Sequence, residues 1–138
     1  YAGYGSTLMW LARASVQVDD IESGQTRFRL GYMDFVSGWA FAPDGQSLGL
    51  AVEGKVRAVD LFSGVERWAV DSQGVYALAY APNSAVLAGA GSQGVYLWDA
   101  ASGALLAHLE GSALEVRFSP DGSALAVRLD DGGVVVWR

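Results

Sequence analysis

The sequence of 138 residues contains no cysteine and only one histidine. The lack of cysteine excludes disulfides, a thiol nucleophile, thiolate zinc sites and iron–sulfur clusters. A histidine-based metal site usually contains two or more histidines, so the single histidine argues against such a site within one chain. No apolar run reaches the roughly 18 residues of a membrane-spanning helix. These absences exclude several classes of metalloprotein and redox protein and give no sign of a membrane protein.

Charge is also scarce, and its balance is negative. Only 17% of the residues are charged and the net charge is −6, which argues against a nucleic-acid backbone or an anionic membrane as the main partner. The chain is instead rich in apolar residues (51%), glycine (18) and aromatic residues (12%). Glycine and aromatic residues together favour short strands and tight turns, and no segment carries the start, stripe and end of a helix. The sequence therefore predicts a single all-β domain.

Two short phrases recur along the chain with one period. A turn-forming run follows an apolar segment at Pro43, Pro82 and Pro120, which are 39 and 38 residues apart. The phrase Asp-x-x-Ser-Gly begins at Asp20, Asp60 and Asp99, which are 40 and 39 residues apart. Two independent markers with the same period and phase indicate a true internal repeat. We expect repeat units at approximately residues 1–35, 36–74, 75–112 and 113–138.

Each unit is predicted to contain four short antiparallel strands. In the third unit these cover residues 75–81, 85–90, 95–98 and 105–109, with turn-forming residues between them. This pattern, with Trp98-Asp99 at the end of a third strand, resembles the WD-repeat (WD40) family, whose propeller blades are about 40–45 residues long. The family dipeptide is replaced at the other units by Asp19-Asp20, Val59-Asp60 and Trp137-Arg138, which makes the chain a divergent member.

The resemblance implies β-propeller blades built from four-stranded antiparallel sheets. Aligning Gly5 with Gly45 gives the first unit three strands, and the last unit ends after a third strand at Trp137. We therefore expect about 14 strands, or three and a half blades, in an incomplete ring. The expected explanation is that the chain is part of a longer propeller, and the alternative is a ring completed by other copies of the chain.

Candidate chemical motifs are each better explained by the fold. The run Gly89-Ala90-Gly91-Ser92-Gln93-Gly94 matches a dinucleotide-binding pattern, but a strand-like segment follows it where that motif requires a helix. The acidic residues near Asp20 and Asp130 lack the spacing of a calcium loop and fit turns. His108 stands on a predicted outer strand with no nucleophile pattern nearby. We expect no catalytic residue, no cofactor and no metal.

A partner-binding surface is expected where the turns between second and third strands meet the links between units. Aromatic and charged residues there suit a protein interface. The candidate residues are Tyr32, Phe35, Glu53, Lys55, Asp71, Gln93 and Asp131. Tyr32 and Phe35 have a second interpretation, in which they fill the gap between adjacent blades. Packing between blades is also expected for four tryptophans: Trp10, Trp39, Trp68 and Trp98.

The function predicted from these features is that of a non-catalytic WD40-like scaffold for protein–protein interaction or assembly. A protein partner is expected, with no nucleic acid and no membrane. Two alternatives stay open: a propeller that binds a small ligand or carbohydrate, and a non-catalytic part of a larger enzyme. A ligand-binding propeller would repeat one exposed aromatic slot in several units. The compartment is left open, with the cytoplasm favoured.

Overall fold

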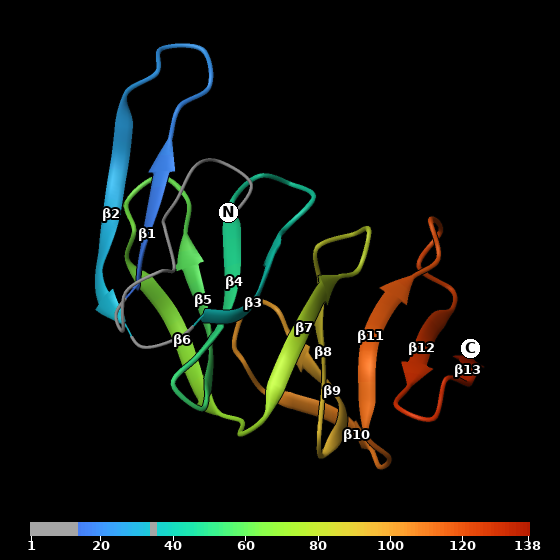
Figure 1. Cartoon of the computed structure of the whole chain (residues 1–138). Helices are drawn as coiled ribbons and strands as arrows, with labels where there is room; N and C mark the ends of the chain where they lie inside the picture. Colours follow the sequence, from blue (N-terminus) through green and yellow to red (C-terminus); the bar gives the residue numbers. More distant parts are fainter. Residues whose placement is uncertain (1–13, 34–35) are drawn as a thin grey trace.

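The computed structural model describes residues 14–33 and 36–138 as 13 strands in four antiparallel sheets (Figure 1). We call these sheets blades 1 to 4 in chain order. Blade 1 contains β1 (Ala14–Asp19) and β2 (Thr26–Met33). Blade 2 contains β3 (Val36–Phe41), β4 (Ser47–Val52), β5 (Lys55–Asp60) and β6 (Glu66–Asp71). Blade 3 contains β7 (Val75–Tyr80), β8 (Val86–Gly91), β9 (Gly94–Asp99) and β10 (Leu105–Leu109). Blade 4 contains β11 (Ala113–Phe118), β12 (Leu125–Leu129) and β13 (Val134–Trp137).

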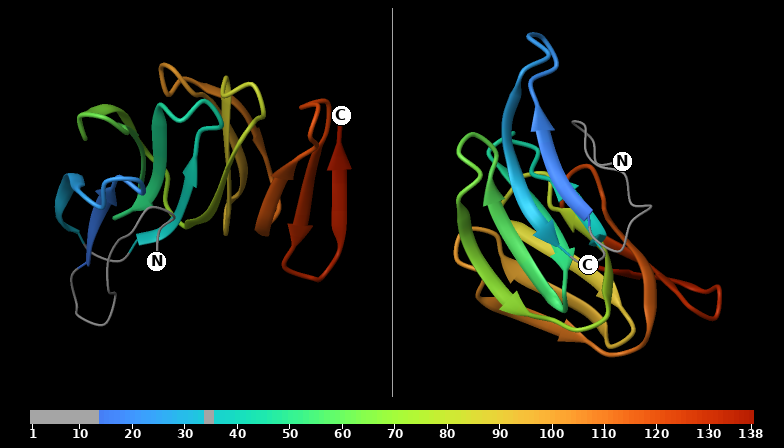
Figure 2. Two further views of the ribbon diagram at one scale, coloured as in Figure 1. Left: turned by 90° about the horizontal axis from the view of Figure 1, so that it is seen from above. Right: turned by 60° about the vertical axis from the view of Figure 1, so that its left-hand side comes forward.

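Within each blade every strand pairs with the next one along the chain. The blades follow one another as an open series, with the first strands β3, β7 and β11 as neighbours (Figure 2). The described residues contain no helix, so the all-β prediction and the incomplete propeller are confirmed. The one further strand expected for the first unit would fall within residues 1–13, outside the described residues.

The phrase Asp-x-x-Ser-Gly folds into the same corner in blades 1 to 3. In blade 2 the Asp60 carboxylate accepts hydrogen bonds from the backbone N–H of Phe62 and of Ser63, both at 2.9 Å. Gly64 closes the corner with φ at 75°, a conformation that favours glycine, and its N–H donates to the Asp60 carbonyl at 2.9 Å. Blade 3 repeats this arrangement from Asp99, and in blade 1 the Asp20 carboxylate accepts the Ser23 N–H while the Asp20 carbonyl accepts the Gly24 N–H. These aspartates serve as turn residues, as predicted.

Two turn aspartates, Asp20 in the corner of blade 1 and Asp121 in the proline turn of blade 4, are expected to make the stability of the fold sensitive to acid. The pKa of Asp20 is lowered to about 2, mainly by the Ser23 N–H and then by Arg27. The pKa of Asp121 is also lowered to about 2, by the Ser123 N–H and by the Ser119 and Ser123 hydroxyls. Because both values lie below the ordinary 3.8, the stabilisation is complete above about pH 5 and disappears as the pH falls toward 2.

We therefore expect the midpoint of urea unfolding to fall between pH 5 and pH 2.5. Asp121→Asn keeps an oxygen that can accept the Ser123 N–H but loses the titrating group, so it should reduce this fall. Measuring both proteins across the pH series checks the prediction. A midpoint that stays constant down to pH 2.5 would show that the turn carboxylates do not contribute.

In blades 2 and 3 the turns between second and third strands are two-residue hairpins. In blade 2, Glu53 and Gly54 have φ of 54° and 73°, and Val52 pairs directly with Lys55. Two residues with positive φ are typical of the primed turns that suit the twist of a hairpin. In blade 3, Ser92-Gln93 connects the paired residues Gly91 and Gly94, and β9 follows immediately. The glycine-rich run of blade 3 is thus a hairpin, as predicted.

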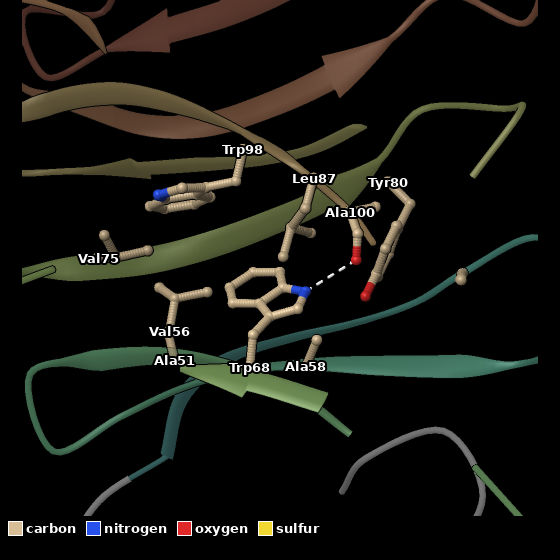
Figure 3. Packing of buried hydrophobic residues seen from close by; sticks show 10 residues of the cluster. Ala51, Val56, Ala58, Trp68, Val75, Tyr80, Leu87, Trp98 and Ala100 are labelled. Carbon is tan, nitrogen blue, oxygen red and sulfur yellow. Dashed lines mark hydrogen bonds between the residues drawn. The ribbon is translucent and has the colours of Figure 1, made fainter. Parts of the chain in front are cut away.

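The core lies between the blades, where small side chains of one blade meet large side chains of the next. A Cβ on Gly49 would lie 3.3 Å from Leu87 and 3.4 Å from Tyr80, so the close packing of blade 3 on blade 2 requires a small residue there. Trp68 packs in the same cluster, and its Nε1 donates to the Ala100 carbonyl oxygen of blade 3 at 2.8 Å (Figure 3). This hydrogen bond satisfies the buried polar end of the indole.

The prediction that tryptophans pack between blades holds for two of them. Trp68 and Trp98 are buried in the cluster between blades 2 and 3. The prediction is wrong for Trp39, whose side chain is 40% exposed. Leu78 and Val116 have the same position in blades 3 and 4, and the first strand of the preceding blade lies beside each of them. Among the described strands, β3 has no such first strand of a preceding blade beside it. Trp10 lies outside the described residues.

Candidate functional site

The turns of the propeller lie on two opposite rims. One rim carries the hairpins between second and third strands together with the links between blades, and we call it the hairpin rim. Three backbone hydrogen bonds join a hairpin to a link: Ser72 N–H to Gly54 O, Ser92 N–H to Gly74 O and Asp130 N–H to Ser112 O. The other rim, the corner rim, carries the Asp-x-x-Ser-Gly corners and the proline turns. Figure 1 shows the hairpin rim at the bottom and the corner rim at the top.

The hairpin rim brings together two of the candidate residues predicted from the sequence. Lys55 begins β5 and Asp71 ends β6, and the Lys55 ammonium lies 3.0 Å from an Asp71 carboxylate oxygen. This ion pair is exposed and so adds little to stability. Glu53 lies in the hairpin turn between β4 and β5, and its carboxylate lies 3.9 Å from the Arg57 guanidinium. Blade 2 thus presents a small exposed group of opposite charges.

Blades 3 and 4 place one candidate each on the same rim. Gln93 lies in the hairpin of blade 3, and its backbone carbonyl oxygen lies 2.8 Å from Nε2 of His108. The His108 ring stacks on Tyr96 at 4.2 Å, so this exposed histidine has a structural role in joining β10 to β9. Asp131 lies in the hairpin of blade 4, where its carboxylate accepts the Gly133 N–H at 2.7 Å.

The remaining two candidates lie at the link between blades 1 and 2. Tyr32 belongs to β2, near the point where the chain leaves blade 1. Phe35 lies outside the described residues. The choice between partner binding and gap filling for these two residues therefore stays a prediction.

Most carboxylates of the corner rim are already used by the fold. The Asp60 pKa is held well below its usual range by the Arg67 guanidinium and by the N–H groups of Ser63 and Phe62. The Asp99 pKa is likewise lowered, chiefly by hydrogen bonds from Ser102. Groups held in this way stabilise turns, and Asp60, whose two carboxylate oxygens are both used, has little capacity left for another ligand.

A hollow of about 570 Å³ on the corner rim was not expected from the sequence. It lies where the first corner, the turn after β3 and the second corner converge. Ile21 and Phe62 stand exposed at its edge, and the Arg27 guanidinium lies 5.1 Å from the centre of the Phe62 ring. Its acidic residues are Asp19, Asp20, Glu22 and Asp44. The repeated phrases showed that such corners exist, but not that these three would meet.

A second hollow, of about 470 Å³, lies along the first strands β3, β7 and β11. Trp39 and Tyr76 line it and are both partly exposed. Their positions in the repeat differ, because Trp39 corresponds to Leu78, whereas Tyr76 corresponds to Ser37. An aromatic slot repeated in several blades, as a sugar-binding propeller would require, is therefore not formed by these residues.

The part of the chain that the structure describes has no group of three or more His, Asp or Glu side chains arranged to hold a metal ion. It also contains no helix with the length and apolarity needed to cross a membrane. The carboxylates that the sequence placed in turns are found there, bonded to the backbone of their own turns.

Comparison with known proteins agrees with this architecture. The family model described as "WD domain, G-beta repeat" matches residues 25–99, a stretch that runs from the start of β2 through all of blade 2 to the end of β9. No curated protein matches the chain. The family model covers more than half of the sequence, and the blades that it covers have the strand order and the corners described above. The chain therefore belongs to the WD40 repeat family.

Proposed function

We propose that the protein is a non-catalytic interaction module that presents its hairpin rim to a protein partner. The WD40 family generally serves as a protein-interaction and scaffold module. The observation that carries the proposal is the contrast between the two rims. The corner rim repeats the same residues from blade to blade, and their side chains hold their own turns. The hairpin rim carries a hairpin turn in each of blades 2 to 4, and both the side chains and the backbone conformation of the turn differ from blade to blade.

This variation supports a role in recognition. The hairpin slot holds Glu53-Gly54 in blade 2, Ser92-Gln93 in blade 3 and two aspartates in blade 4. The charged and polar residues of these turns are exposed at the rim, so they can contact a partner. Electrostatic complementarity at such a rim contributes to specificity and association rate more than to raw affinity.

A charge swap at the Lys55–Asp71 pair tests the proposal. Lys55→Asp combined with Asp71→Lys keeps an opposite-charge pair across β5 and β6, so the fold should be preserved. The partner, however, meets both charges reversed. We expect the swapped protein to lose at least tenfold in affinity for a partner captured by the unaltered protein, because like charges at an interface are strongly unfavourable.

The matched control changes the corner rim instead. Asp121→Asn alters one exposed charge there and should leave the affinity for the partner unchanged. Titration of the purified partner against the three proteins measures the difference. Equal affinity of the swapped and unaltered proteins would reject the hairpin rim. Saturable binding of a glycan or metabolite, with no protein partner recovered, would favour the ligand-binding alternative.

A further inference from the structure

The fourth strands of blades 2 and 3 form the outer edge of these two blades. Both blades have all four strands, with β6 and β10 at the end of the sheet opposite the first strand. The first strands β3, β7 and β11 neighbour one another, so β6 and β10 lie on the outside of the propeller. Among the described strands, β6 pairs only with β5, and β10 only with β9. An exposed edge of this kind can pair with another chain unless charged side chains protect it.

A β-bulge follows the Asp-x-x-Ser-Gly corner in blades 1, 2 and 3. Its unpaired residue is Arg27 in blade 1, Arg67 in blade 2 and Leu106 in blade 3. The Arg27 guanidinium donates to Oδ2 of Asp20 at 2.9 Å, and the Arg67 guanidinium donates to Oδ2 of Asp60 at 2.7 Å. In blades 1 and 2 the bulge thus places a charged side chain on the outer strand and fills the second oxygen of the corner carboxylate.

Blade 3 leaves its corner carboxylate only partly used. Oδ1 of Asp99 accepts the N–H groups of Ala101 and Ser102, both at 3.0 Å, as in blade 2. Oδ2 accepts no hydrogen bond from any described residue, and it remains accessible to solvent. None of the nine lysines and arginines lies between Arg67 and Arg117 in the sequence, so blade 3 carries no cation of this kind to pair with Asp99.

The outer strand of blade 3 is also unusually apolar. β10 reads Leu-Leu-Ala-His-Leu and contains no Asp, Glu, Lys or Arg. Leu105 and Leu106 are 57% and 55% exposed. The same two positions of blade 2 hold Glu66 and Arg67, which protect the edge of β6 by charge. Blade 3 therefore presents an unprotected strand edge, two exposed leucines and an aspartate without its arginine at one place.

We propose that β10 binds an extended apolar segment of a partner protein that carries one arginine. The segment adds to the outer edge of β10 as a fifth strand, which provides main-chain hydrogen bonds. Its apolar side chains cover Leu105 and Leu106. Its guanidinium donates to Oδ2 of Asp99, in place of the internal arginine of blades 1 and 2. A second copy of β10 fits this edge less well, because it brings no cation for Asp99.

Fluorescence anisotropy with labelled peptides tests this proposal. The probe is an amidated peptide of alternating Thr and Val that ends in Arg, since an antiparallel segment places its C-terminal end beside the Asp99 corner. In the control peptides Gln or Glu replaces the Arg. We expect saturable binding of the Arg peptide, binding about tenfold weaker for the Gln peptide, and no binding of the Glu peptide. The amides of β10 should exchange more slowly with deuterium in the complex.

Two variants change the protein side of the contact. Leu106→Arg supplies Asp99 with the internal partner that blades 1 and 2 have, so it should preserve the fold and weaken binding of the Arg peptide at least tenfold. Asp99→Asn keeps an Oδ1 that can accept the turn N–H groups but loses the charge. It should weaken binding of the Arg peptide about tenfold and leave binding of the Gln peptide unchanged.

Val65→Arg is the matched control for Leu106→Arg. Val65 is 63% exposed just before β6, so the variant adds the same charge beside the outer strand of blade 2. It should leave peptide binding unchanged, with circular dichroism confirming that all variants fold. An equal loss in both arginine variants, equal binding of the Arg and Gln peptides, or unchanged exchange of the β10 amides would overturn the proposal. A dimer of the unaltered protein that Leu106→Arg dissociates would also overturn it, in favour of a second copy of the chain.

This surface lies on the outer strand of blade 3, so the peptide tests are independent of the proposal for the hairpin rim. Neither the charge swap at Lys55 and Asp71 nor its outcome alters β10 or its corner. Loss of the peptide contact in Leu106→Arg, with the affinity of the hairpin-rim partner unchanged, would show two separate binding surfaces.

Discussion

Replacing Trp68 by alanine is expected to destabilise the protein by about 3–5 kcal/mol. The indole is buried between blades 2 and 3, and its Nε1 donates to the Ala100 carbonyl oxygen at 2.8 Å (Figure 3). Alanine would leave a cavity in the hydrophobic cluster between these blades, and it would leave the Ala100 carbonyl without its donor. Urea unfolding followed by circular dichroism measures the loss of unfolding free energy.

Two further variants separate the causes of this loss. Trp68→Phe keeps most of the ring but removes the hydrogen bond to Ala100, so it should cost less than Trp68→Ala. Trp39→Ala removes a tryptophan that is already 40% exposed and should cost less than half as much. If Trp39→Ala cost as much as Trp68→Ala, packing between blades 2 and 3 would not be the main source of stability.

Gly103→Ala is expected to destabilise the protein by about 2–4 kcal/mol. Gly103 closes the corner of blade 3 with φ at 78°, a conformation that costs energy for any residue with a Cβ. A Cβ would also lie 2.7 Å from the Trp68 indole, which the surrounding core holds in place. Backbone strain and steric overlap therefore add at this position.

Gly24→Ala provides the matched control for Gly103→Ala. Gly24 has the same place in the corner of blade 1, with φ at 71°, but a Cβ there would meet nothing within 4 Å. It should cost about 1 kcal/mol, from backbone strain alone. In the Trp68→Ala background, Gly103→Ala should fall to a similar cost, because the indole is gone. Full additivity of the two substitutions would contradict the steric explanation.

Local features of this chain were predictable because they depend on nearby residues. The Asp20, Asp60 and Asp99 corners follow from a phrase of five residues whose side chains bond to their own backbone. The fourth strand of blade 3 was predicted at residues 105–109 and is found there, whereas the hairpin turn was predicted two residues too long. The glycines that flank the turn continue the strands, because their pairing is maintained up to the turn.

Features that depend on three-dimensional neighbours were harder to predict. Trp39 looks like any other strand tryptophan in the sequence, but its burial depends on whether a first strand of another blade lies beside it. The acidic hollow of the corner rim joins turns that are about 20 residues apart along the chain. One difference between blades is visible in the sequence, since aligning the repeats sets Glu115, Arg117 and Arg128 of blade 4 against small residues of blades 2 and 3.

Amide hydrogen–deuterium exchange of the protein with and without its captured partner tests the central proposal most directly. We expect slower exchange on binding at the hairpins near Glu53 and Gln93 and at the links near Gln73 and Glu110, because all four belong to the hairpin rim. The corners at Asp60 and Asp99 should exchange at the same rate in both states. Slower exchange confined to those corners, with the hairpins unchanged, would contradict the assignment of the partner to the hairpin rim.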